Sequence, residues 1–125
     1  MKVNLLGIVI ILLFGCASGT DPNLGDEFVL KYGQSTSIND QNISITFTGV
    51  GADSRCPTGV LCVWEGNAEI FLDINSESYS INTSLDPRII FHDDYQLELI
   101  SVSPYPVYGD TIDIEDYEIR VVLIK

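Results

Sequence analysis

The chain has 125 residues and a formal net charge of −12, with 18 acidic residues against 6 lysines and arginines. A charge of this sign repels phosphate backbones and anionic lipid surfaces, so the composition argues against nucleic acid as a partner. The length fits one domain behind a short leader, and the dispersed acidic residues indicate a solvated surface.

The first predicted element is an N-terminal export signal in residues 1–15. Lys2 supplies a short basic region, residues 5–14 form a nearly unbroken apolar run, and Gly15 precedes Cys16. The run is too short to cross a bilayer as a helix, which needs about 20 residues, and it has the layout of a cleaved signal. It resembles a bacterial lipoprotein signal, which implies cleavage before Cys16 and lipidation of that residue.

This resemblance predicts a lipid-anchored protein of the cell envelope. We expect it at the outer membrane where the organism has one, and otherwise at the outer face of the cytoplasmic membrane. Residues 16–26 are small and polar, with one proline and two glycines, and are expected to form a flexible tether. Ten such residues have an r.m.s. reach of about 17 Å, which would keep the domain of residues 27–125 close to the bilayer.

From residue 27 onward the hydrophobic pattern predicts β-strands. Strands are expected at residues 28–30, 43–48, 62–74, 79–81, 88–92, 95–102 and 117–124, with a bulge or bend at Gly66 and Asn67. At most one helical turn is expected, at residues 113–116. Seven or eight short strands joined by polar turns predict an all-β fold, an antiparallel β-sandwich or small barrel.

Cys56 and Cys62 remain as a pair once Cys16 is assigned to the lipid. In an oxidising compartment we expect them to form a structural disulfide, worth about 2.4 kcal/mol for a seven-residue loop. Zinc is the alternative, but it needs four ligands and the sequence offers only these thiols and His92. We therefore expect no metal and no cofactor.

The densest motif is DSRCPTGVLCVWEG, residues 53–66. Cys62 and Trp64 would share one face of a strand, so the only tryptophan is expected in the core beside the disulfide. Arg55 can pair with Asp53 or another of the many carboxylates. The functional alternative is that this constrained loop binds a protein partner. The residues it would present are Ser54, Arg55 and Pro57.

A second motif is SPYPVYG, residues 103–109. Alternating proline and tyrosine favour an extended path, and the prolines end the ladder of the preceding strand. Tyr105 and Tyr108 would either cover an open end of the core or form an exposed aromatic surface for a protein or a glycan.

These two motifs, with the closing DYEIRVVL of residues 116–123, resemble an uncharacterised family of small secreted or lipid-anchored bacterial proteins. The shared pattern is a DSRCP…C-x-W-x-G segment and a late SPYP segment, and the resemblance covers most of residues 28–124. It supports the fold and the disulfide. It supplies no catalytic residue, because that family has no assigned activity.

Carboxylates cluster at residues 92–94 and 110–116 without EF-hand spacing, so they are interpreted as solvated turns. His92 is the only histidine and no serine lies in a Gly-x-Ser-x-Gly turn, so we expect no enzyme. The sequence predicts a non-catalytic binding or structural module, with another envelope protein as a possible partner. Two alternatives stay open: an inhibitor of secreted proteases acting through residues 53–59, and a small hydrolase built around His92.

Overall fold

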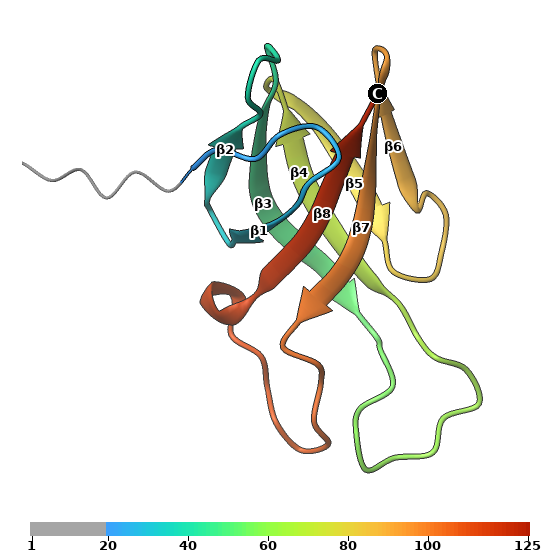
Figure 1. Ribbon diagram of the computed structural model, residues 1–125. Helices are drawn as coiled ribbons and strands as arrows, with labels where there is room; N and C mark the ends of the chain where they lie inside the picture. Colours follow the sequence, from blue (N-terminus) through green and yellow to red (C-terminus); the bar gives the residue numbers. More distant parts are fainter. Residues whose placement is uncertain (1–19) are drawn as a thin grey trace, which may run out of the picture.

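A computed structural model describes residues 20–125; the predicted signal, Cys16 and the start of the tether lie outside these residues. Within them the chain forms eight strands in two antiparallel four-stranded sheets, which face each other as a β-sandwich (Figure 1). The strands are β1 (Glu27–Lys31), β2 (Ser35–Ser37), β3 (Ser44–Asp53), β4 (Ala68–Ile74), β5 (Glu77–Asn82), β6 (Ile89–His92), β7 (Tyr95–Ser103) and β8 (Glu118–Ile124). The predicted all-β antiparallel class is confirmed.

One sheet has the order β1-β8-β7-β6 and the other β2-β3-β4-β5. A short 3-10 helix, η1 (Ile114–Asp116), precedes β8 where the sequence predicts a single turn. No helix within residues 20–125 is long and apolar enough to span a membrane.

Apolar and polar residues alternate along these strands, so each strand turns its apolar side chains towards the core between the two sheets. In β3, Ile45 and Phe47 are fully buried, while Ser44 and Thr48 on the opposite face are exposed. The expected shared face at the C-terminal strand is confirmed, since every member is buried: Tyr117, Ile119, Val121 and Leu123. Each large apolar side chain buried in this way contributes about 1.5–3 kcal/mol to folding.

The segment before β4 is not the long strand expected from residue 62 onward. β4 begins at Ala68, because Gly66 adopts a φ of +75° and turns the chain out of the extended conformation. Trp64 therefore lies in a loop with half of its surface exposed (50%), and its expected place in the core is wrong. β2 was not predicted, because its sequence STS carries no hydrophobic pattern.

Residues 21–26 pack on the sandwich, which differs from the flexible tether expected there. The Pro22 carbonyl accepts the Asn39 N–H at 2.9 Å, and the Gly25 N–H donates to the Leu123 carbonyl at 2.8 Å. Leu24 packs against the core. Residues 21–26 are thereby held beside the C-terminal end of β8.

Two long connections leave the opposite end of the sandwich (Figure 1). The first loop, residues 54–67, joins β3 to β4, and the second loop, residues 104–113, leads from β7 to η1. They contain the two motifs that the sequence singles out, and we call them the paired loops.

Candidate functional site

Arg55 lies buried at the base of the paired loops, only 7% exposed. Its Nε and Nη2 donate to the two carboxylate oxygens of Asp53 at 2.9 and 2.8 Å, a bidentate ion pair. Its Nη1 donates to the Val102 carbonyl at 2.7 Å, and Nη2 also donates to the Pro104 carbonyl at 2.9 Å. A planar guanidinium with several donors suits such a junction. Arg55 thus joins the first loop to the end of β7 and the start of the second loop.

Tyr117 completes this junction from the chain segment before β8, because its hydroxyl donates to Asp53 Oδ2 at 2.8 Å. Burial raises the pKa of Asp53, but hydrogen bonds from Arg55 and Tyr117 and the charge of Arg55 outweigh burial, so its pKa lies below the usual value. Burial and the bond to Asp53 raise the pKa of Tyr117 to about 12. At neutral pH the junction therefore holds an ionised Asp53 and a protonated Tyr117.

The two arms of the first loop meet through Ser54, Gly66 and Asn67. The Ser54 N–H and hydroxyl donate to the Asn67 carbonyl at 2.7 and 3.1 Å, and the Asn67 N–H donates to Ser54 Oγ at 3.1 Å. A Cβ on Gly66 would overlap the Ser54 carbonyl oxygen. Only glycine permits this close approach, and it also permits the positive φ.

Further along, the two loops pair with each other. Thr58 and Val107 form an isolated parallel bridge. The Thr58 N–H donates to the Pro106 carbonyl at 3.0 Å, and the Tyr108 N–H donates to the Thr58 carbonyl at 3.3 Å. The disulfide between Cys56 and Cys62 closes the first loop and confirms the predicted pairing. The paired loops therefore form one projection, with the disulfide inside the first loop and hydrogen bonds between the two loops.

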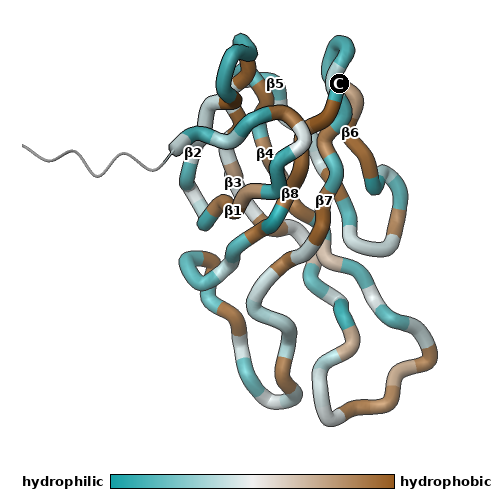
Figure 2. Tube along the Cα trace, in the orientation of Figure 1, coloured by the Kyte–Doolittle hydropathy of each residue, from teal (hydrophilic) through white to brown (hydrophobic). Residues whose placement is uncertain are grey.

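Large apolar side chains on the outer part of this projection are exposed. Leu61 and Val63 are fully exposed, and Tyr108 is 74% exposed. Figure 2 shows the hydrophobic stretch along the far edge of the first loop. We call the following residues the apolar tip: Val60, Leu61, Val63, Trp64, Tyr105, Val107 and Tyr108. Single exposed apolar residues are common, whereas larger exposed apolar patches are typical of interaction sites, so the apolar tip is a candidate site.

The structure divides the predicted binding residues into two groups. Arg55 is buried and braces the loop, which differs from the expectation that it faces a partner. Ser54 is exposed, and its side chain also bonds to Asn67. Pro57 is half-buried. Tyr105 and Tyr108 belong to the apolar tip, and the Tyr105 ring also covers the Arg55 guanidinium at 5.2 Å.

Sequence reasoning missed the main part of the apolar tip, the first-loop residues Val60, Leu61, Val63 and Trp64. One signal points to them. A disulfide loop of seven residues is too short to carry the apolar residues at its turn into a distant core, so Val60 and Leu61 were candidates for exposure.

His92, the last residue of β6, is buried and packs against Tyr79 of β5. Its Nδ1 lies 2.6 Å from the Tyr79 hydroxyl and 3.3 Å from Glu77 Oε2, and its Nε2 lies 3.6 Å from Asp93 Oδ2. The hydrogen bond to Glu77 and partial burial raise the pKa of Tyr79 to about 12. These contacts link the two sheets. Within residues 20–125, no three histidine, cysteine, aspartate or glutamate side chains form a group that could hold a metal ion.

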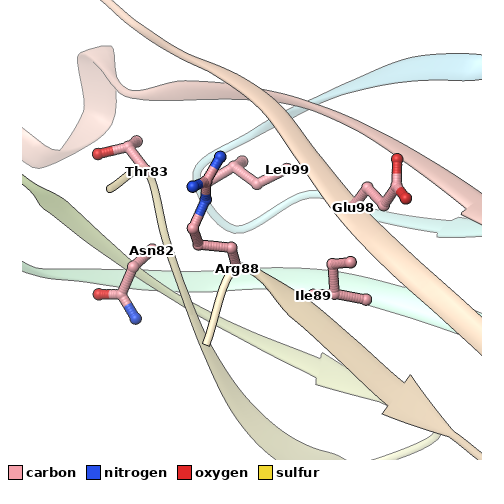
Figure 3. A pocket seen from close by; sticks show the side chains of 6 residues that line it. All are labelled: Asn82, Thr83, Arg88, Ile89, Glu98 and Leu99. Atoms are coloured by element: carbon pink, nitrogen blue, oxygen red, sulfur yellow. The ribbon is translucent and has the colours of Figure 1, made fainter. Parts of the chain in front are cut away.

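A hollow of about 440 Å³ lies among β5, β6 and β7. Figure 3 shows that its side chains point in different directions and do not converge on one point. Asn82 is already engaged: its Oδ1 accepts from Asn67 Nδ2 at 2.9 Å, and its Nδ2 donates to the Pro87 carbonyl at 3.2 Å. This hollow therefore has no assembled set of ligand-binding groups, and the paired loops are the better candidate.

Comparison with protein-family models, with curated proteins and with solved structures finds no match to this chain.

Proposed function

We propose that this protein is a non-catalytic binding module of the cell envelope that recognises another protein through the apolar tip of its paired loops. The observation that carries the proposal is the combination of exposure and bracing. Leu61, Val63 and Tyr108 are exposed, while the disulfide, the Arg55 junction and the Thr58–Val107 bridge hold the loops beneath them.

Bracing favours binding because an ordered loop loses little conformational freedom in a complex. Tryptophan and tyrosine favour it too, since they are the residues that most often dominate the energy of protein interfaces. The apolar tip contains the only tryptophan, Trp64, and two of the six tyrosines, Tyr105 and Tyr108.

The geometry of the sandwich suits a protein attached by its N-terminus. Residues 21–25 pack beside Leu123 at the finishing end of β8, whereas the paired loops leave the other end (Figure 1). If Cys16 carries the predicted lipid, the apolar tip points away from that membrane and towards other proteins of the envelope.

The protease-inhibitor alternative depended on an arginine presented by the first loop. Arg55 is 7% exposed and all its polar contacts lie within the protein, so it does not provide such a side chain. An inhibitor contact would instead involve residues 60–64, and no observation favours a protease over other protein partners.

The test compares partner capture by the full-length protein and by the variant Leu61→Ser/Val63→Ser. Crosslinking and pull-down from native envelope should recover partners with the natural chain and at least about tenfold less with this variant. The matched control is Leu85→Ser/Phe91→Ser, which changes two exposed apolar residues (51% and 66%) away from the tip. Equal recovery by the tip variant and the natural chain would show that the proposal is wrong.

A further inference from the structure

The charges around the apolar tip narrow the class of its partner. The paired loops and η1 contain five exposed acidic residues: Glu65, Asp110, Asp113, Glu115 and Asp116. Their one basic residue is Arg55, which is buried and neutralised by Asp53. At this end of the sandwich, the exposed side-chain charge in these segments is therefore negative only.

Two of these carboxylates lie close to tip residues in the chain. Glu65 follows Trp64 in the chain, and it lines a hollow of about 270 Å³ together with Tyr105. Asp110 lies two residues after Tyr108, and it lines another hollow that extends past Pro106 to Asp53 and Tyr117. Each loop thus carries an exposed carboxylate within two residues of an aromatic residue of the tip.

We propose that the partner is a basic protein that receives the apolar tip in an apolar cleft bordered by lysine or arginine side chains. The proposal rests on the proposed function and names its partner class. In protein interfaces the apolar centre is desolvated while the polar rim stays accessible, and complementary rim charges orient the encounter and accelerate it. Glu65 and Asp110 occupy the rim positions here.

The same carboxylates disfavour two other partners for the apolar tip, a second copy of this chain and a lipid bilayer. A second copy would bring a like-charged border against this one, on a chain whose net charge is already −12. An anionic bilayer repels the same carboxylates. A zwitterionic bilayer would need Glu65 and Asp110 to enter the headgroup region, with no exposed basic side chain in the paired loops to pair with the lipid phosphates.

The experiment uses the full-length protein and the proteins of native envelope extract, identified by mass spectrometry. Three variants are compared with the natural chain. The tip variant is Leu61→Ser/Val63→Ser and the rim variant is Glu65→Gln/Asp110→Asn. The control variant Asp40→Asn/Asp94→Asn removes the same charge from two exposed turns of the β2–β3 and β6–β7 connections.

We expect the proteins that depend on the tip to carry a net positive charge. Their dissociation constants should rise about tenfold for the rim variant and rise with salt between 50 and 300 mM, because surface charge pairs are screened. The rim variant should respond less to salt, and the control variant should behave like the natural chain.

The failures of the two proposals are distinguishable. Tip-dependent partners that are neutral or acidic, or that ignore both salt and the rim variant, overturn the basic-partner inference and leave the proposed function standing. No tip-dependent protein at all overturns both. Tip-dependent binding to phosphatidylcholine vesicles, or tip-dependent dimers in sedimentation, replaces the basic protein by a membrane or a second copy and overturns the inference.

Discussion

The Tyr117 hydroxyl donates a hydrogen bond of 2.8 Å to Oδ2 of Asp53, a residue 64 positions earlier in the chain. The same oxygen accepts from Arg55 Nη2, which also donates to the Pro104 carbonyl. The DSRCP, SPYP and DYEIR segments are therefore parts of one buried junction. Its role is to brace the paired loops beneath the apolar tip.

Arg55→Ala should lower the free energy of unfolding by about 3–5 kcal/mol, because removing one partner of a buried ion pair leaves the other charge uncompensated. Arg120→Ala is the matched control, since its pair with Glu27 is long (3.7 Å) and half-exposed. The control should cost no more than about 1 kcal/mol. Urea unfolding measures both values, and similar losses for the two variants would contradict the buried junction.

Asp53→Asn should change the pH dependence of stability. The pKa of Asp53 is lower in the folded protein than its ordinary value of 3.8, so its contribution is present above that value and is lost as the pH falls through the folded pKa. The difference in unfolding free energy between the natural chain and Asp53→Asn should be larger at pH 7 than at pH 3. The other carboxylates occur in both proteins, so their titration largely cancels in this difference. If the difference in unfolding free energy did not change with pH, the bonds assigned from Arg55 and Tyr117 to Asp53 would be wrong.

Gly66→Ala should destabilise the protein far more than Gly59→Ala. Both glycines have positive φ, which costs another residue about 1–2 kcal/mol. A Cβ at Gly59 meets nothing within 4 Å, whereas one at Gly66 would overlap the Ser54 carbonyl. Thermal melting of the two variants measures the difference. Equal melting temperatures would show that the two arms of the first loop do not approach as closely as described.

Trp64 provides a direct optical test of the apolar tip, because it is the only tryptophan. Its half-exposed indole should emit at a wavelength close to that of a solvated one, and acrylamide should quench it readily in the folded protein. Unfolding in urea should therefore shift the emission little, while partner binding should shift it to the blue. A large red shift on unfolding would restore the core position that the sequence predicts.

Cys56→Ser/Cys62→Ser should lower the unfolding free energy by about 2.4 kcal/mol, the chain-entropy value for so short a loop. The sandwich should remain, because neither cysteine belongs to the hydrophobic core cluster. Far-UV circular dichroism should be unchanged while partner capture weakens. Reduction of the natural chain should reproduce both effects, and loss of the β-spectrum in either experiment would contradict this separation of loop and core.

The sequence by itself determined the strands whose side chains alternate, the turn before β8 and the disulfide. These are local properties. The alternation of apolar and polar residues alone predicts the buried face of β3, with Ile45 and Phe47, and of β8, with Ile119 and Val121. The two cysteines are six residues apart, so their pairing does not depend on a distant segment.

Only the tertiary structure decided the roles of Arg55 and Trp64. From the sequence, Arg55 could pair with a carboxylate or face a partner, and Trp64 was expected in the core. The fold buries Arg55, because β7 ends where the Val102 and Pro104 carbonyls can accept from it, 47 and 49 residues away. Gly66 meanwhile turns the segment before β4 outwards and leaves Trp64 in solvent. The burial of these side chains depends on which distant segments pack together, and the local hydrophobic pattern does not predict that packing.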